Sequence, residues 1–213
     1  MNNFGSEAHR APISVAEALA QARAAATGGR RRLLGITGFP GAGKSTLAEQ
    51  VLAAVPGAAL VPMDGFHLAQ AVLDEAGLAD RKGAPETFDR HGYAALLRRL
   101  RDQSRDDPPV YAPTFRRDIE EPIAGAIGIR PDCPLVVTEG NYLLHWPEVR
   151  ALLDEVWWVE IDRLERLRRL TARHEAYGKA PAEASAWARG SDERNAALIA
   201  DGRDLAQIVV AGD

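Results

Sequence analysis

One short segment constrains the fold of this chain more than any other. Residues 38–45 read Gly-Phe-Pro-Gly-Ala-Gly-Lys-Ser and match the P-loop pattern G-x-x-x-x-G-K-[ST] at every required position. An apolar run precedes the match and a helical pattern follows it, which disfavours the alternative of a glycine turn that merely happens to precede a helix. The segment therefore predicts a phosphate-binding loop between a buried strand and a helix.

The residue types in this loop explain what it binds. Glycines let the backbone take positive φ angles and turn its N–H groups towards a phosphate, and the helix that starts near Gly43 points its positive dipole end at the same anion. We expect Lys44 to reach the β- and γ-phosphates of a nucleotide and the Ser45 hydroxyl to ligate Mg²⁺. The residues predicted to hold the nucleotide on this loop are Gly38, Gly41, Ala42, Gly43, Lys44, Ser45 and Thr46.

Apolar segments alternate with helical segments along the rest of the chain. Strands are expected at residues 32–37, 59–63, 135–138, 156–161 and 206–210, and helices at 13–27, 43–55, 93–103, 163–177 and from there up to Gly202. Residues 68–89 predict a short helix and a loop, and three prolines predict an irregular stretch over residues 110–131. The alternation predicts an α/β, three-layer P-loop NTPase fold with a five-stranded parallel sheet.

Composition narrows the class of protein. The 213 residues suit a single domain, 1–213, with a loose terminus over residues 1–10. The net charge of −4 and the lack of a long basic run argue against a nucleic-acid partner. A single cysteine, Cys133, excludes an intrachain disulfide, and no apolar run is long enough to span a membrane. We therefore expect a soluble, cytoplasmic protein with no membrane partner.

Three absent patterns narrow the class of P-loop protein. No Asn-Lys-x-Asp or Thr-Lys-x-Asp stretch is present, so the usual guanine-reading device is missing and ATP is favoured over GTP. No Asp-x-x-Gly follows an apolar strand, which removes the usual GTPase switch, and no Leu-Ser-Gly-Gly stretch indicates a transporter ATPase. A P-loop alone does not name a reaction, so the rest of the prediction depends on other residues.

Two carboxylates follow predicted strands. Asp64 comes directly after residues 59–63, and Glu139 comes directly after residues 135–138. Because the carboxyl ends of parallel strands face the ligand crevice, Asp64 is a candidate to orient and deprotonate an acceptor hydroxyl. Glu139 is a candidate to face Mg²⁺, directly or through water. The alternatives are a helix cap for Asp64 and an ordinary strand-end carboxylate for Glu139.

An arginine-rich helical segment begins at residue 163 and carries five arginines. Most charge runs are simply solvated, but a helix of this kind after the fourth strand can close over the phosphates of a nucleotide and neutralise the charge that develops during transfer. We predict a lid over residues 163–180. Its candidates for phosphate contact are Arg166, Arg169 and Arg173, with Arg169 taken as catalytic.

Together these features resemble the phosphoribulokinase, uridine kinase and pantothenate kinase group of P-loop kinases, and are most similar to bacterial fructose-transport-system kinases. The resemblance extends from about residue 11 to residue 210. The segments that carry it read Asp-Gly-Phe-His at 64–67, Arg-Lys-Gly-Ala-Pro-Glu-Thr-Phe-Asp at 81–89, Val-Tyr-Ala-Pro at 110–113, Glu-Glu-Pro-Ile-Ala-Gly-Ala at 120–126 and Glu-Gly-Asn-Tyr-Leu-Leu at 139–144.

The resemblance implies ATP and Mg²⁺ as cosubstrates and Asp64 as the catalytic base. By analogy it places adenine against residues 189–203, with Asn195 and Arg203 as contacts. The chain departs from the family pattern at Arg116, where family members often carry an aspartate, and this puts the acceptor or the local salt bridging in question.

The acceptor pocket is expected between residues 67 and 117, together with the end of the third clear strand. Polar and aromatic side chains are frequent there, as a polyol or nucleoside site requires, whereas a phosphorylated acceptor requires at least two cations that converge on it. The ordinary alternative is that these cations are solvated and the aromatics are core. The predicted acceptor contacts are His67, Arg81, Lys82, Tyr111, Arg117 and Asn141.

The predicted activity is that of an ATP-dependent kinase. Such a phosphotransferase transfers the γ-phosphate to an alcohol group of a small molecule, for example the sugar fructose. A nucleoside, pantothenate-like or phosphosugar acceptor is the alternative within this class. The alternative from another class is an ATP-driven regulatory or assembly protein, which we would expect to expose a sizeable apolar surface. The sequence leaves open whether the chain forms a homodimer.

Overall fold

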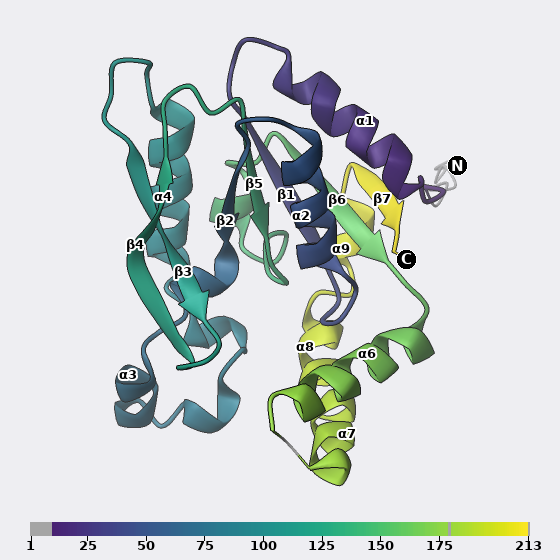
Figure 1. Ribbon diagram of the computed structural model, residues 1–213. Helices are drawn as coiled ribbons and strands as arrows, with labels where there is room; N and C mark the ends of the chain where they lie inside the picture. The colour runs from purple at the N-terminus through teal and green to yellow at the C-terminus, as the bar shows by residue number, and fades with distance from the viewer. Residues whose placement is uncertain (1–9, 179, 213) are drawn as a thin grey trace, which may run out of the picture.

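A sheet of five parallel strands forms the centre of the molecule, in the order β2-β5-β1-β6-β7 (Figure 1). The computed structural model describes residues 10–178 and 180–212, so the expected loose terminus lies, apart from Arg10, outside the described residues. The strands are β1 (Arg32–Gly38), β2 (Ala59–Pro62), β5 (Leu135–Glu139), β6 (Glu155–Glu160) and β7 (Ile208–Ala211). The five-stranded parallel sheet expected from the sequence is confirmed.

Helices cover both faces of this sheet. Successive strand residues point to opposite faces, so Leu33 and Trp158 pack against one helical layer, and Leu34 and Trp157 pack against the other. The second of these layers consists of α1 (Val15–Ala26) and α2 (Lys44–Ala54), and the first includes α4 (Arg90–Asp102) and α5 (Pro147–Arg150). This arrangement is the expected three-layer architecture.

A short helical region follows β2 and leads into α4. It contains 3₁₀ turns at Met63–Phe66, Ala79–Arg81 and Pro85–Thr87, with helix α3 at Gln70–Glu75 between the first two. The sequence predicted a short helix and a loop here. Figure 1 shows this region beyond the carboxyl end of the sheet, on the same side as strands β3 and β4.

The prediction of an irregular stretch over residues 110–131 is wrong. It forms an antiparallel hairpin of β3 (Val110–Arg116) and β4 (Glu121–Ile129). Proline lacks the N–H that a strand donates, so it is tolerated at bulges and at strand ends or edges. Pro113 lies where the register shifts between Ala112 and Thr114, and Pro122 pairs with Phe115 beside the turn. The prolines therefore interrupt the ladder without preventing the hairpin.

Between β6 and β7 the chain forms a separate helical group. Helix α6 (Arg163–Ala176) was expected, but the single helix expected up to Gly202 is two, α7 (Pro181–Arg189) and α8 (Ser191–Leu198), and a further short helix, α9 (Gly202–Leu205), begins at Gly202. Leu167, Leu170 and Ala188 give the group a small core of its own. Figure 1 shows α6 to α8 beyond the carboxyl end of the sheet, opposite α3. Among the described helices, none has the length and apolar character needed to cross a bilayer.

Candidate active site

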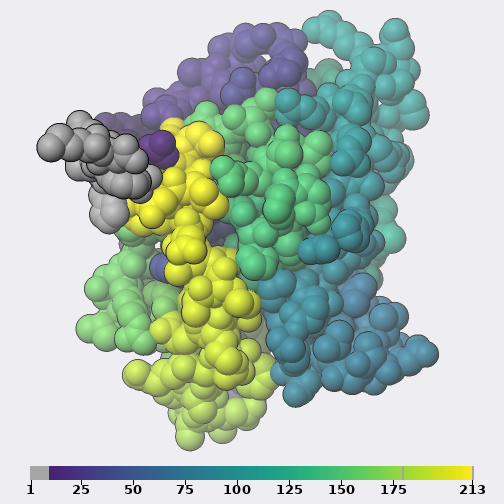
Figure 2. All heavy atoms as spheres, turned by 180° about the vertical axis from the view of Figure 1, so that it is seen from behind, coloured from purple at the N-terminus to yellow at the C-terminus, as the bar shows by residue number. Residues whose placement is uncertain are grey.

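A cleft of about 480 Å³ lies at the carboxyl end of the sheet, between the α3 and hairpin side and the α6–α8 group. From behind, α8 and the segment around residues 70–90 lie next to each other (Figure 2), and Asn195 Nδ2 on α8 contacts Gly83 O at 3.4 Å. Polar residues from segments far apart in the sequence line this cleft. They include Lys44, Ser45, Asp64, His67, Lys82, Arg117, Glu139, Asn141, Arg173, His174, Asp192 and Asn195.

The loop between β1 and α2 has the backbone that phosphate binding requires. Gly41 and Gly43 adopt φ angles of 81° and 94°, a region that side chains rarely tolerate. Gly43 is the N-cap of α2 and offers no side-chain cap, so the first N–H groups of the helix have no side-chain partner there. The helix therefore presents free donors and its positive dipole end to an anion, as the motif predicts.

Lys44 is the first residue of α2 and is 8% exposed. Its Nζ donates to the carbonyl oxygens of Gly38, at 3.1 Å, and Phe39, at 3.0 Å. Burial lowers the pKa of Lys44 to about 8, while the nearby Glu139 carboxylate acts in the opposite direction. The ammonium group is thus held inside the loop by neutral oxygens, where phosphate oxygens would be stronger partners.

Glu139 ends β5 and is 9% exposed. Burial, and next the charge of Asp64, raise the pKa of Glu139 to about 7, whereas Lys44 and the Ser45 hydroxyl favour its ionised form. Within residues 10–178 and 180–212, no group of three or more His, Cys, Asp or Glu side chains gathers into a metal site. Ser45 with Glu139 nevertheless fits Mg²⁺, which commonly takes few protein oxygens and completes its shell with phosphates and water.

Asp64 lies in the 3₁₀ turn that follows β2, with its side chain 28% exposed. Its Oδ2 accepts a hydrogen bond from Arg117 Nη2 at 3.0 Å. The next helix, α3, has Ala69 as its N-cap and no side-chain cap, so Asp64 does not cap it. The turn packs closely on the hairpin, because a Cβ added at Gly65 would lie 2.7 Å from Pro113 O. The hairpin that the sequence did not predict therefore positions this carboxylate.

An aromatic wall follows Asp64. The His67 ring stacks on Phe88 with centroids 3.9 Å apart, and it lies 5.0 Å from the Phe115 ring. Burial lowers the pKa of His67, which favours the neutral imidazole. Among the described residues its buried Nδ1 has no hydrogen-bond partner. Lys82 and Arg117 lie near the same Phe115 ring, so the cleft brings together three of the predicted acceptor contacts, and Asn141 lines it as well.

The three candidate lid arginines have different surroundings. Arg173 lines the cleft, and its charge acts on Lys44. Arg166 is buried, pairs with Glu193 of α8 and lies 5.3 Å from the Phe39 ring. Arg169 binds Glu165 at 2.7 Å and lies outside this cleft, on the other side of the loop. Phosphate contact by Arg166 and Arg169 stays a prediction.

Arg169 lines a second, smaller hollow of about 50 Å³ beside the phosphate loop. Ala42, Gly43 and Thr46, which were predicted to bind the nucleotide, border it. Val210 and Ala211 from the end of β7, and Gly212 directly after it, also border the hollow. The hollow thus joins the start of α2 to the last strand of the sheet.

Some predicted contacts lie elsewhere. Arg81 forms an ion pair with Glu86, and Tyr111 is 59% exposed on β3; neither lines the cleft. Arg203 pairs with Glu160 and also lies outside the cleft, whereas Asn195 lines it. The structure therefore separates the two residues that the resemblance assigned to adenine.

Arg116, where the chain departs from the family pattern, forms an ion pair with Asp118 and does not line the cleft. In this structure the departure affects the salt bridging of the hairpin turn.

Several cleft residues of α6 and α8 were not predicted from the sequence. His174 Nε2 and Asp192 Oδ2 lie 2.8 Å apart and connect α6 to α8, and Ser191 also lines the cleft. Ser191 and Asn195 are four residues apart on α8, so they share one face of the helix. That spacing of polar residues was the available signal.

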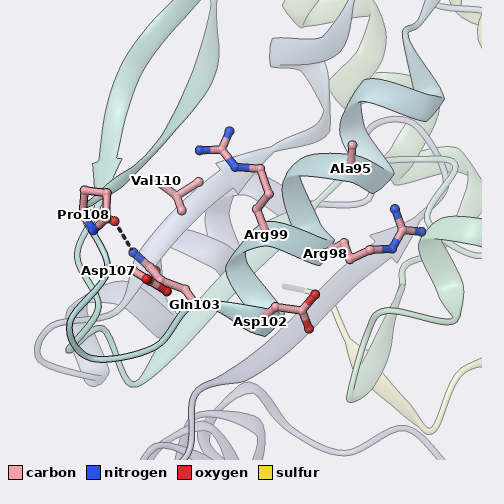
Figure 3. A pocket seen from close by; sticks show the side chains of 8 residues that line it. All are labelled: Ala95, Arg98, Arg99, Asp102, Gln103, Asp107, Pro108 and Val110. Atoms are coloured by element: carbon pink, nitrogen blue, oxygen red, sulfur yellow. Dashed lines mark hydrogen bonds between the residues drawn. The ribbon is translucent and has the colours of Figure 1, made fainter.

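A further hollow, of about 450 Å³, lies away from this cleft, beside α4 and the start of β3 (Figure 3). Arg98, Arg99 and Asp102 line it, and Gln103 Nε2 donates to Pro108 O at 2.8 Å. None of the residues predicted to act in catalysis or binding lies there. The chemistry suggested by the sequence is therefore concentrated in the cleft between the hairpin and α6–α8.

Comparison with known proteins gives a consistent family. The family model for the methylmalonyl Co-A mutase-associated GTPase MeaB matches residues 6–59, about a quarter of the chain, which contain the phosphate loop. An ATP-dependent kinase-like protein of Aspergillus versicolor is 36% identical over 162 residues, covering 71% of this chain and 94% of the relative. A proposed uridine kinase of Schizosaccharomyces pombe is 30% identical over 174 residues, covering 75% and 73% of the two chains.

A solved structure extends the likeness to the fold. The crystal structure of a proposed fructose transport system kinase from Silicibacter sp. TM1040 superposes with a TM-score of 0.81 and is 35% identical in sequence. The match covers 92% of this chain and 98% of the other. The resemblance inferred from the sequence motifs is confirmed.

Proposed function

Because this chain belongs to the P-loop kinases, we propose that it transfers the γ-phosphate of ATP to a hydroxyl group of a small-molecule acceptor, with Asp64 as the general base. The observation that carries the proposal is the position of Asp64 in one cleft with Lys44, Glu139 and Arg173. In this reaction Asp64 takes the hydroxyl proton as the acceptor oxygen bonds to the γ-phosphorus. The bond from that phosphorus to the β,γ-bridging oxygen breaks, and its electron pair leaves with ADP.

The nucleotide side of the cleft fits this role. The free N–H groups at the start of α2 bind phosphate oxygens, and Lys44 exchanges its two carbonyl partners for them. Ser45 and Glu139 would hold Mg²⁺, which when bound neutralises charge on the β- and γ-phosphates. Arg173 approaches the same phosphates from α6. These positive groups stabilise the charge that spreads over the transferred phosphoryl group.

We place one edge of the adenine against the hollow beside the phosphate loop, which at about 50 Å³ is smaller than the ring itself. Thr46, Ala211 and Gly212 border that hollow, and Arg169 offers a planar guanidinium that can stack on a ring. This proposal differs from the assignment of adenine to residues 189–203 that the resemblance implied, because none of those residues borders the hollow.

The acceptor side favours a small polar molecule. His67, Phe88 and Phe115 provide flat surfaces, while Lys82, Arg117 and Asn141 provide hydrogen-bond donors. A sugar such as fructose is one acceptor of this kind, and a nucleoside, pantothenate-like compound or phosphosugar is another. The arrangement favours a kinase over an ATP-driven regulatory protein, because the cleft beyond the phosphates contains a base and a shaped polar wall.

The test is ATP consumption by the purified protein with Mg²⁺, screened against sugars, polyols, nucleosides, hydroxy acids and phosphosugars. We expect a rate that depends on one acceptor class and a phosphorylated product in mass spectra. Lys44→Ala is expected to abolish turnover. Asp64→Asn is expected to lower kcat by ~10²- to 10⁴-fold with little change in the KM for ATP, because it loses the base but not the phosphate contacts.

Two outcomes would contradict the proposal. Steady ATP hydrolysis that is indifferent to every acceptor would favour a regulatory ATPase. Full activity of Asp64→Asn would remove this residue as the base.

A further inference from the structure

The acceptor side of the cleft contains two cations that the nucleotide does not require. Lys44 and Arg173 serve the phosphate end, where their charges act on each other. Lys82 and Arg117 lie on the opposite wall, with Nζ 5.5 Å and Cζ 6.0 Å from the centroid of the Phe115 ring. Asp64 lies between the two groups, because it binds Arg117 directly and its charge also acts on Lys44.

Lys82 is held in place rather than solvated. Its side chain is only 17% exposed, and Nζ donates to Gln70 Oε1 at 3.1 Å and to Glu120 O at 2.6 Å. Both acceptors are neutral oxygens, and the Glu120 carboxylate is 3.8 Å from Nζ and 59% exposed. An ammonium group has three N–H donors, so one remains for a ligand at a fixed position.

Arg117 has one polar contact among the described residues, and that contact is with the base. Its Nη2 donates to Asp64 Oδ2 at 3.0 Å. The guanidinium group therefore occupies an oxygen of the carboxylate that must receive the acceptor's proton. It also has four further N–H donors, enough to bind a second anion in the two-pronged geometry that arginine prefers.

Proton transfer changes the charge balance at this wall. Once Asp64 has taken the hydroxyl proton it is neutral, and Arg117 has lost its counterion. A neutral acceptor would leave that charge uncompensated next to the aromatic wall, whereas an acceptor with its own negative group would compensate it. The same group would draw Arg117 away from Asp64 Oδ2 and leave that oxygen free to receive the proton.

We propose that the acceptor is a hydroxy compound with an anionic group, a carboxylate or a phosphate, which Lys82 and Arg117 bind while its hydroxyl faces Asp64. This inference rests on the proposed kinase function and specifies its substrate class. The anion lies at the hairpin wall and the reacting hydroxyl lies towards the phosphate loop. Acceptor binding and release of the base are then a single event.

The test measures binding separately from turnover. The full-length protein, saturated with Mg²⁺ and a non-hydrolysable ATP analogue, is titrated in a thermal-shift assay with glycerate and glycerol, and with fructose 6-phosphate and fructose. We expect at least one anionic member to raise the melting temperature at concentrations where its neutral counterpart has no effect. Glycerate separates a carboxylate site from the phosphate site reported by fructose 6-phosphate.

Variants assign the effect to the two cations. Arg117→Gln and Lys82→Gln are each expected to weaken binding of the anionic probe by ~10- to 100-fold, the loss expected for a hydrogen bond to a charged group. Arg116→Gln is the matched control, because Arg116 is adjacent in sequence, pairs with Asp118 and lies outside the cleft. It is expected to bind the probe as the unmodified protein does.

The outcomes separate the two proposals. Equal or stronger binding of the neutral probes, no binding of either anionic probe, or no effect of Arg117→Gln and Lys82→Gln would each overturn the anionic acceptor. Anion binding that requires Arg117, with no phosphoryl transfer to any bound hydroxy acid or phosphosugar, would support the anion site and contradict the kinase function instead.

Discussion

Lys44 and Glu139 are two oppositely charged, buried residues of the cleft, 8% and 9% exposed. Burial acts against both charges, so the pKa of Lys44 falls to about 8 and that of Glu139 rises to about 7. Each favours the charge of the other, and each gains a further partner in the proposed complex: phosphate for Lys44 and Mg²⁺ for Glu139. The cleft therefore holds groups whose charged forms the proposed ligands stabilise.

The raised pKa of Glu139 predicts how stability depends on pH. Between its ordinary value of 4.5 and about 7, the native protein keeps a proton that the unfolded chain has lost, so this group lowers the free energy of unfolding as pH rises through that range. Glu139→Gln lacks this effect. In urea unfolding of the nucleotide-free protein from pH 5 to pH 8, we expect the variant to become progressively more stable than the unmodified protein up to about pH 7.

Comparison of the two proteins cancels the contribution of other carboxylates, such as Glu165, whose pKa is lowered by Arg168 and Arg169 and which acts in the opposite direction. Glu75→Gln, at an exposed position at the end of α3, is the control for the same change of side chain at the surface. Parallel profiles for Glu139→Gln and the unmodified protein would contradict the burial of an ionisable carboxylate here.

At the scale of elements, α6 shows how one helix distributes its arginines. Arg166 faces inward to Glu193 and Phe39, Arg168 faces outward to Glu165, and Arg173 lines the cleft. Arg166 and Arg173 are seven residues, about two turns, apart and therefore share a face, and this face meets the phosphate loop, where Leu170 and the Arg166 carbonyl approach Gly41. The helix thus combines attachment to α8 with delivery of a cation to the cleft.

This difference predicts different kinetic effects. Arg173→Ala is expected to lower kcat by ~10²- to 10³-fold, the loss typical of one group that stabilises charge in the transition state. Arg168→Ala, with a side chain 69% exposed, should retain nearly full activity. Steady-state kinetics with the acceptor found in the screen will compare the two, and equal losses would show that the helix contributes charge only in a general way.

The same scale shows what the sequence can and cannot predict. The five strands and the phosphate loop follow from apolar runs and one motif, because these depend on local pattern. The hairpin was not predicted, since nothing local shows that Pro113 falls at a register shift.

Residues adjacent in the sequence of the acceptor region also differ in their surroundings. Lys82 lines the cleft while Arg81 pairs with Glu86. Tyr111 faces solvent because Ala112 next to it faces the core. Such choices depend on tertiary packing.

At the scale of the whole molecule, the site joins parts that are distant in the sequence. The cleft collects residues from Pro40 to Asn195, and the hollow beside the phosphate loop adds Ala211 from the last strand. The phosphate loop, the hairpin side and the α6–α8 group therefore all contact a bound nucleotide or acceptor in the proposed complex. Ligand binding should stabilise the fold as a unit rather than one element of it.

A non-hydrolysable ATP analogue with Mg²⁺ is therefore expected to raise the melting temperature. At 100 times its Kd, the analogue adds about 2.7 kcal/mol to the free energy of unfolding, which corresponds to roughly 5–10 °C for a domain of this size. Lys44→Ala should lose most of this increase in differential scanning calorimetry. An equal increase in the variant would show that the analogue binds away from the phosphate loop.

The carbonyl oxygen of Gly83 accepts hydrogen bonds from Tyr142 Oη, at 2.6 Å, and from Asn195 Nδ2, at 3.4 Å. The short bond connects the loop around Gly83 to Tyr142 in the body of the protein, and the long bond connects that loop to α8. Because the longer bond is the weaker one, α8 can separate here while the loop around Gly83 stays bound to Tyr142. In the proposed reaction, products can then leave at this end of the cleft when the weak contact of Asn195 with Gly83 is lost, while the surface that receives the next acceptor molecule stays assembled.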